Sequence, residues 1–207
     1  MRIKTFVAGP VGTNCYIVSK EETGECFFVD MAMYTKEMSD YISNNDLHVK
    51  GVLLTHGHFD HIMGLDELLE EHPVPVYAFK DEQKLLEDGA LNASSTMYGR
   101  TYVFHDAEWL HDGQKLELAG FQIIVIHTPG HTCGGCCYYL PEENCLFSGD
   151  TLFQASIGRT DLPTGSGSQL VRSVKERLFQ LLDETIVYPG HMEESSIGYE
   201  KKYNPYV

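Results

Sequence analysis

The segment Thr55 to His61 reads Thr-His-Gly-His-Phe-Asp-His and follows directly on the apolar run Val49 to Leu54. Three imidazoles and one carboxylate thus crowd the expected end of a buried strand. Zinc, iron and manganese prefer such ligands, and packing four of them into one short loop without a cation would strain any fold. The cluster therefore predicts a metal site. The alternative, a polar turn with chance histidines, is disfavoured because ligand-type residues reappear downstream in similar surroundings.

Three further apolar segments end in a residue of this type. The runs 121–126, 145–147 and 185–188 lead into short turns that deliver His131, Asp150 and His191, respectively. Small residues beside each of them, as in the two Pro-Gly-His triplets, let the backbone turn sharply. The sequence thus predicts four strand ends that converge on one site.

The converging segments supply more ligands than one tetrahedral site can use while it still admits a substrate. The seven candidates are His56, His58, Asp60, His61, His131, Asp150 and His191. We therefore expect two divalent ions. His56 and His58 could turn toward one ion, Asp60 and His61 would face a neighbouring one, and Asp150 could bridge both at a spacing of ~3.5–4 Å.

Composition limits the class of protein and its partners. A chain of 207 residues with 43% hydrophobic content can bury a core as a single domain. The net charge of −15 opposes nucleic acid, whose recognition normally begins with a basic face. Neither a signal peptide nor an apolar run of membrane-spanning length is visible, so we expect a cytoplasmic protein with no membrane partner. The six cysteines are then expected to be free.

Hydrophobic patterning predicts more strands than helices. The expected strands are 3–7, 15–18, 26–29, 49–54, 74–79, 115–118, 121–126, 136–140, 145–147 and 185–188. The expected helices are 36–43, 61–71, 82–87 and 169–182. This mixture favours an α/β sandwich in which two sheets pack together and helices cover their outer faces.

These motifs resemble those of the metallo-β-lactamase superfamily and, within it, the hydroxyacylglutathione hydrolase (glyoxalase II) group. The resemblance extends over nearly the whole chain. It implies an αββα sandwich with two mixed sheets, in which His56, His58 and His131 bind one metal ion, Asp60, His61 and His191 bind the other, and Asp150 bridges them. Zinc is the expected metal, with iron and manganese as alternatives.

The resemblance also bears on the substrate. Gly149 to Phe153 is followed by Gly158-Arg159, where glyoxalase II enzymes place a basic residue that contacts glutathione, so Arg159 is the candidate substrate contact. Full-length glyoxalase II carries a C-terminal helical domain, but only 16 residues follow His191 here. We expect residues 1–207 to form a single metallo-β-lactamase-like domain without that extension. The acidic stretch Met192 to Ser196 also departs from the group's pattern.

The expected activity is hydrolysis of a thioester or similar activated ester, a small molecule, by hydroxide formed from water bound between two cations. Asp60 is the candidate to orient that water or accept its proton. One alternative is an iron-dependent oxygenase like the persulfide dioxygenases of the same superfamily. Further alternatives are a lactonase or β-lactam hydrolase and a non-catalytic metal-binding module. The acyl group, the use of glutathione and the oligomeric state stay open.

A Cys-x-x-Cys motif at Cys133 and Cys136 would suggest thiol redox chemistry in another setting. Here Cys136 and Cys137 begin an expected strand, and no helix N-terminus follows that would lower a thiol pKa. The sequence favours structural thiols.

Overall fold

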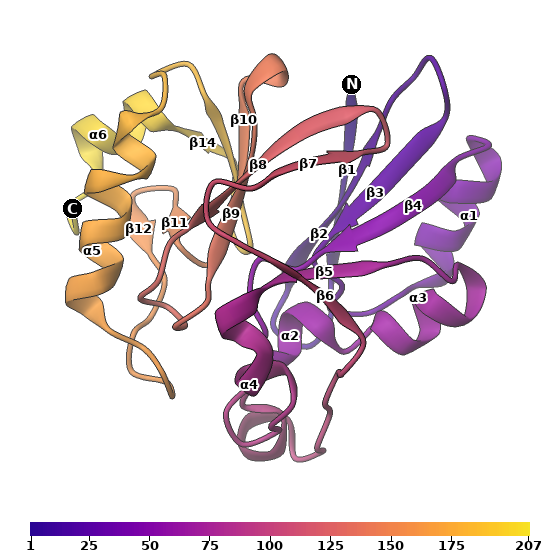
Figure 1. The fold of residues 1–207 in the computed structure, drawn as a ribbon, viewed down its shortest axis with the longest axis horizontal. Coiled ribbons are helices and arrows are strands. Elements are labelled where there is room, and N and C mark those ends of the chain that lie inside the picture. Colours follow the sequence, from indigo (N-terminus) through magenta and orange to yellow (C-terminus); the bar gives the residue numbers. More distant parts are fainter.

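The computed structural model describes residues 1–207, and its layers run helix, sheet, sheet, helix (Figure 1). The first sheet has six strands that lie in their order along the chain, β1-β2-β3-β4-β5-β6. Its first three strands pair antiparallel and the others parallel, so the sheet is mixed. The strands are β1 (Arg2–Ala8), β2 (Thr13–Ser19), β3 (Glu25–Val29), β4 (His48–Leu53), β5 (Val76–Phe79) and β6 (Ala107–Leu110).

The second sheet also has six strands, in the order β14-β13-β10-β9-β8-β7. It is mixed too, because β10 and β13 pair parallel and the remaining neighbours antiparallel. Its strands are β7 (Lys115–Leu118), β8 (Phe121–His127), β9 (Cys136–Leu140), β10 (Cys145–Gly149), β13 (Ile186–Pro189) and β14 (Ser195–Ser196). A small hairpin joins β11 (Leu152–Phe153) to β12 (Ser156–Ile157).

Helices cover the outer face of each sheet (Figure 1): α1 and α3 lie over the first, and α5 and α6 over the second. The α-helices are α1 (Lys36–Asn44), α2 (Phe59–Ile62), α3 (Leu65–Glu71), α4 (Gln83–Leu86), α5 (Gly167–Glu176) and α6 (Ile197–Tyr203). Short 3₁₀ turns are η1 (Lys80–Glu82), η3 (Pro141–Glu143) and η4 (Leu178–Gln180), and η2 (Ser94–Tyr98) is a π turn. None of the helices combines the length and apolar character that crossing a lipid bilayer requires.

Three apolar cores hold the layers together. Met38 of α1 and Leu68 of α3 belong to the same cluster as Ile17 of β2 in the first core, outside the first sheet. The second core lies between the sheets, where Val18 of β2 belongs to the same cluster as Tyr138 of β9. Cys137, Leu146, Val174, Val187 and Ile197 join α5 and α6 to the second sheet in the third. Successive side chains of a strand point to opposite faces of the sheet, so β2 and β9 each contribute side chains to two cores.

The predicted αββα sandwich is confirmed, and each expected strand is present with small shifts at its ends. Two expected helices were too long. The predicted helix 61–71 breaks between α2 and α3, because the Gly64 amide donates to the Met31 carbonyl rather than to the turn before it. The predicted helix 169–182 ends at Glu176 and continues only as the 3₁₀ turn η4. Sequence patterning missed α6, the edge strand β6, and the two-residue strands β11, β12 and β14.

Candidate metal centre

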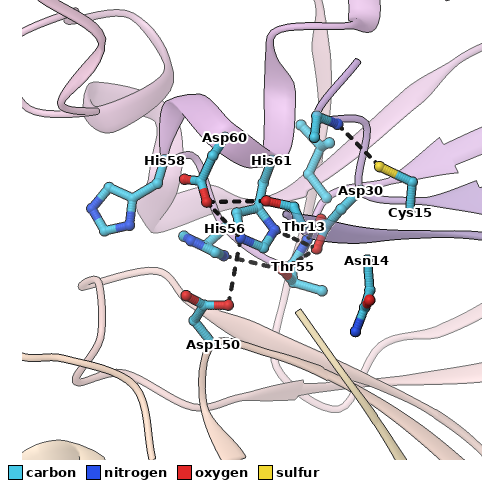
Figure 2. Close-up of polar contacts among 12 residues, drawn as sticks. Thr13, Asn14, Cys15, Asp30, Thr55, His56, His58, Asp60, His61 and Asp150 are labelled. Atoms are coloured by element: carbon cyan, nitrogen blue, oxygen red, sulfur yellow. Dashed lines mark hydrogen bonds and ion pairs between the residues drawn. The ribbon is translucent and has the colours of Figure 1, made fainter. Parts of the chain in front are cut away.

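The opening cluster lies where the chain leaves β4 and enters α2. His58 caps this short helix, and Asp60 and His61 fall within its single turn (Figure 2). All four side chains are buried, and His61 is fully enclosed. The ring centroids of His61 and His56 lie 4.1 Å apart, so His61 stands where the two expected ion positions adjoin.

The second sheet delivers the other three candidates from its strand ends. His131 follows β8, Asp150 follows β10 directly, and His191 follows β13. Gly130 in the first Pro-Gly-His turn has φ +141°, and a Cβ there would collide with the backbone of Leu170 in α5. The turn therefore packs directly against the start of that helix, which fixes where His131 emerges.

The structure brings all seven candidates together in one site. His131 Nε2 lies 2.9 Å from His58 Nδ1 and 3.3 Å from His56 Nε2. Asp60 Oδ2 lies 3.7 Å from His61 Nε2 and 3.3 Å from His191 Nε2. We call the first group, His56, His58 and His131, subsite A, and the second, Asp60, His61 and His191, subsite B. Within each group the ligand atoms lie within 4.8 Å of one another.

Asp150 stands between the two subsites. Its carboxylate oxygens lie 3.5 Å from His131 Nε2 of subsite A, and 3.4 Å from His61 Nε2 and 3.6 Å from His191 Nε2 of subsite B. Ligands held at about 2.0–2.1 Å around a tetrahedral ion are separated by roughly 3.4 Å. The spacing of the ligand atoms therefore suits one ion in each subsite.

Two further observations show that the site fits cations. His58 Nε2, His61 Nε2 and Asp150 Oδ1 are buried without any hydrogen-bond partner, although such atoms are normally satisfied. A Cβ at Gly190 would run into Asp150 Oδ1 and would come within 2.7 Å of His61 Cε1, so glycine keeps this space open. His61 Nε2 and Asp150 Oδ1 lie 3.4 Å apart beside this space, where a cation would satisfy both.

The electrostatics divide the histidines. Burial, reinforced by the neighbouring His131, lowers the pKa of His58 to about 3, and burial among other imidazoles lowers the pKa of His56 as well. Both rings are therefore neutral, as metal ligation requires. In subsite B, burial would lower the pKa of His61, but the carboxylates of Asp30, Asp60 and Asp150 outweigh it and raise the value.

The carboxylates at the site stay ionised. Burial would raise the pKa of Asp150, but attraction to the rings of His61 and His131, whose Nε2 atoms lie 3.4 and 3.5 Å from its oxygens, holds it well below its usual range. Burial also opposes ionisation of Asp60, whose pKa is nevertheless lowered by His61 and by the hydrogen bond with His191. The Thr13 hydroxyl donates to Asp60 Oδ2 at 3.1 Å and orients this carboxylate.

Sequence reasoning missed two buried acids behind the site. Asp30 accepts hydrogen bonds from His61 Nδ1 at 2.8 Å and from the Thr55 amide and hydroxyl (Figure 2). It follows the predicted strand 26–29, so the rule that found His131 and Asp150 would have found it too. Glu82, fully buried at the end of η1, contacts the loops of subsite A, and no feature of its sequence surroundings signals this. Burial raises its pKa to about 7 although Thr132, Gly57 and Gly134 donate to it.

A cavity of about 280 Å³ opens onto both subsites. Its floor is formed by His58, Asp60, His131, Asp150 and His191. Its walls are apolar apart from one cation, and consist of Val11, Phe59, Ala93, Met97, Phe153, Leu162 and Arg159. Such a combination, an apolar cleft with a few convergent polar groups, is typical of sites for small molecules.

Arg159 lies at this cavity, as the sequence predicted for a substrate contact, but its guanidinium is already paired. Nε and Nη2 donate to the two carboxylate oxygens of Asp161, each at 2.8 Å, at the exposed rim. The Arg159 backbone carbonyl accepts from His131 Nδ1 at 2.7 Å, which leaves His131 Nε2 free to face subsite A. Arg159 therefore orients a candidate ligand through its main chain.

The cysteines lie apart from the seven candidates. All six are free, and Cys133 alone is not buried. Burial raises the pKa of Cys136 well above its usual range and that of Cys137 to about 11. Neither the pKa values nor the positions favour nucleophilic thiols, in agreement with the structural role expected from the sequence.

The layered fold and the shared His/Asp centre define a class of metal-dependent hydrolases. A family model described as "Metallo-beta-lactamase superfamily" matches residues 8–191, and the chain belongs to this superfamily. The chain is 32% identical to "Hydroxyacylglutathione hydrolase GloC" of Haemophilus influenzae over 210 residues, which cover 100% of this chain and 98% of that protein.

Two solved structures resemble the whole fold. "BLEG-1 B3 metallo-beta-lactamase" has a TM-score of 0.93 at 37% identity and covers 99% of both chains. "TTHA1623 in a di-iron-bound form" has a TM-score of 0.87 at 33% identity, covering 99% of this chain and 100% of the other. The superfamily and the His/Asp cluster together indicate divalent metal ions, whose identity these comparisons leave open.

Proposed function

We propose that the protein hydrolyses small thioesters at a dinuclear metal site, in the manner of the hydroxyacylglutathione hydrolases. Subsite A would hold one ion, subsite B the other, and Asp150 would bridge them. The observation that carries the proposal is the position of Asp150, whose oxygens lie 3.4–3.6 Å from histidines of both subsites at the floor of an apolar cavity. The name of the similar Haemophilus influenzae protein supports the choice of thioesters.

Two bound cations would lower the pKa of water and polarise the substrate carbonyl. The chain's own residues supply the remaining requirements. Asp60, ionised and held by Thr13, faces the cavity and can orient the attacking water or take its proton. Phe59, Phe153 and Leu162 exclude bulk water around the carbonyl. A thiolate leaving group needs no separate general acid, since thiols have pKa values near 8.5.

The apolar walls favour an apolar or uncharged acyl group. Val11, Met97 and Leu162 offer no polar contact through their side chains, and burial of each substrate CH₂ against such walls contributes about 0.8 kcal/mol. We also propose zinc as the resident metal, because four-coordinate sites of histidine and carboxylate suit it. Iron is the principal alternative, since the similar TTHA1623 was solved with two irons.

The activity test is a panel of thioesters assayed on protein purified without added metal, with metal content measured on the same sample by mass spectrometry. We expect close to two equivalents of metal and turnover that is unchanged under anaerobic conditions. Oxygen uptake coupled to turnover, with one iron per chain, would instead show the dioxygenase activity. Full occupancy without turnover of any ester or thioester would favour a non-catalytic metal-binding module.

A second candidate function is hydrolysis of β-lactams. The observation in its favour is the likeness to BLEG-1, which covers almost the whole chain. Both reactions attack an activated carbonyl, so a chromogenic cephalosporin belongs in the same panel. A kcat/KM for the cephalosporin above that for every thioester would replace the thioester proposal.

The pairing of Arg159 with Asp161 predicts a weak response to anionic thioesters. The substitution Asp161→Asn frees the guanidinium, so kcat/KM for S-lactoylglutathione, which carries carboxylates, should rise roughly two- to fivefold, the modest effect expected of an exposed ion pair. An uncharged thioester of similar acyl size serves as the matched substrate and should show no gain. The double variant Asp161→Asn with Arg159→Gln should lose the gain. An unchanged preference in Asp161→Asn would show that Arg159 does not contact the substrate.

We further propose that residues 1–207 act as one domain. The two subsites combine ligands from both sheets, and Ile197 of α6 packs in the same core as Val174 of α5 and Leu146 of β10. The site therefore depends on packing of both halves of the sandwich.

A further inference from the structure

We propose that Glu82 is a positioning residue for subsite A and sets the affinity of that subsite separately from subsite B. The inference rests on the proposed two-metal function. Glu82 is fully buried at the end of η1, outside the candidate ligand set. Its carboxylate connects the two loops that carry the three histidines of subsite A.

Each carboxylate oxygen serves a different loop. Glu82 Oε2 accepts from the Gly57 amide at 3.0 Å, and Gly57 stands between His56 and His58. Glu82 Oε1 accepts from the Gly134 amide at 2.8 Å and from the Thr132 hydroxyl, directly after His131. One side chain thus joins the His56–His58 loop to the His131 loop, beside the direct backbone bond from the Cys136 amide to the Thr55 carbonyl.

The contacts leave little freedom for the two loops to separate. A Cβ at Gly57 would meet Glu82 Oε2, Leu85 Cδ2 and Leu86 Cγ, each at 3.1 Å. A Cβ at Gly134 would collide with the Glu82 backbone amide. Both loops therefore lie directly on the turn that carries Glu82, and its side chain joins them through hydrogen bonds rather than through apolar packing.

The cost of burying a carboxylate supports a role at the site. No cation lies within ion-pair distance of Glu82, and the effective penalty for enclosing a charge is several kcal/mol. All three donors come from the loops of subsite A, so the hydrogen bonds that offset this penalty exist only when those loops are in place. An apolar side chain would fill the space at lower cost but would leave the Gly57 and Gly134 amides without acceptors.

Asp30 has the corresponding position behind subsite B. It binds His61 Nδ1 of subsite B directly. It reaches subsite A only through Thr55, whose hydroxyl donates to Asp30 and lies 3.1 Å from His56 Nδ1. The direct hydrogen bonds of Glu82 thus go to the loops of subsite A, whereas Asp30 binds a ring of subsite B directly. Removing one should weaken one metal ion selectively.

The test compares Glu82→Ala and Glu82→Gln with the matched variant Asp30→Asn by titrating each metal-free protein with Zn²⁺ against a competing chelator. Wild type should take up two tight equivalents. Glu82→Ala should still bind one Zn²⁺ as tightly as wild type but bind the second about 10–100-fold more weakly. This is the usual effect of removing the hydrogen-bond partner that orients a metal ligand. Glu82→Gln retains one carbonyl acceptor but presents its amide NH₂ to a donor, so its loss should be smaller and in the same direction.

Imidazole nitrogen NMR identifies which subsite is lost. At one equivalent of Zn²⁺, Glu82→Ala should show metal-induced shifts at His61 and His191 but not at His58 and His131, and Asp30→Asn should show the opposite. Equal loss at both subsites would indicate a merely structural role, and wild-type affinity at both would overturn the proposal. Should Glu82→Ala not fold, the same criteria apply to Glu82→Gln. Fewer than two equivalents in wild type would instead contradict the proposed dinuclear function.

Discussion

Replacing Asp150 with asparagine should remove most of the activity and reduce metal content to one equivalent or less. Asparagine keeps the volume but loses the charge that, in this structure, stands between His131 and two histidines of subsite B. Loss of the bridging carboxylate should cost on the order of 4 kcal/mol of transition-state stabilisation, within the range of several kcal/mol that metal ions supply. Such a loss corresponds to roughly a thousandfold in kcat/KM.

The measurement pairs metal content with thioester kinetics. Asp183→Asn is the control, because Asp183 is an exposed carboxylate that pairs with Lys201 and lies in the loop between η4 and β13, outside the cavity lining. It should retain both equivalents and wild-type turnover. If Asp150→Asn binds two equivalents of metal tightly and turns over thioesters at the wild-type rate, the reaction does not need a bridging carboxylate at this position.

The site was visible in the sequence because its ligands obey a local rule. Each candidate lies in the turn or short helix that follows an apolar run, and strand ends that meet at one edge of the sandwich bring such residues together. The same rule applies to Asp30, which follows β3 directly but was not recognised as part of the site. Its partner, His61, is 31 positions away.

Features that depend on long-range packing could not be predicted in the same way. Glu82 lies in a stretch that reads as the polar start of a helix, and only the folded chain places it between the loops at 57 and 134. The cavity walls come from separate loops, with Val11 and Met97 far apart in sequence and without shared periodicity. The pairing of Arg159 with Asp161 is local but depends on side-chain rotamers that residue spacing does not determine.

The lengths of the helices were overestimated for a related reason. Periodicity alone continues through Gly64 and beyond Glu176. A tertiary hydrogen bond interrupts the first helix, whereas α5 ends at Glu176 and gives way to the 3₁₀ turn η4. At Gly64 the competing acceptor is the Met31 carbonyl, which also ties the start of α3 to the end of β3.

Removing the metal ions should lower the stability of the protein strongly. A ligand that binds the native state alone stabilises it by about 4 kcal/mol when its free concentration is a thousand times its Kd. For a domain of this size each kcal/mol shifts Tm by roughly 2–4 °C, so loss of even one such ion should lower Tm by on the order of 10 °C. Calorimetry before and after exhaustive chelation measures the change, and re-addition of Zn²⁺ should restore it. An unchanged Tm in protein shown to have lost its metal would contradict tight ligation by the buried site.

The metal-free protein should also show a characteristic pH dependence. His56, His58 and His131 have lowered pKa values in the folded protein. They therefore stabilise the fold at pH values above 6.5, the pKa of histidine in the unfolded chain. This stabilisation is lost as the pH falls toward about 3, the folded-state pKa of His58. His61 and His191 have raised pKa values in the folded protein. They therefore stabilise the fold below pH 6.5, and this stabilisation is lost as the pH rises through their folded-state pKa values. Metal-free Tm should therefore be highest near pH 6.5. Bound cations replace the protons on His61 and His191, so the difference in Tm between loaded and metal-free protein should widen above that pH, and a difference that narrows there would contradict the assignment of these two rings to subsite B.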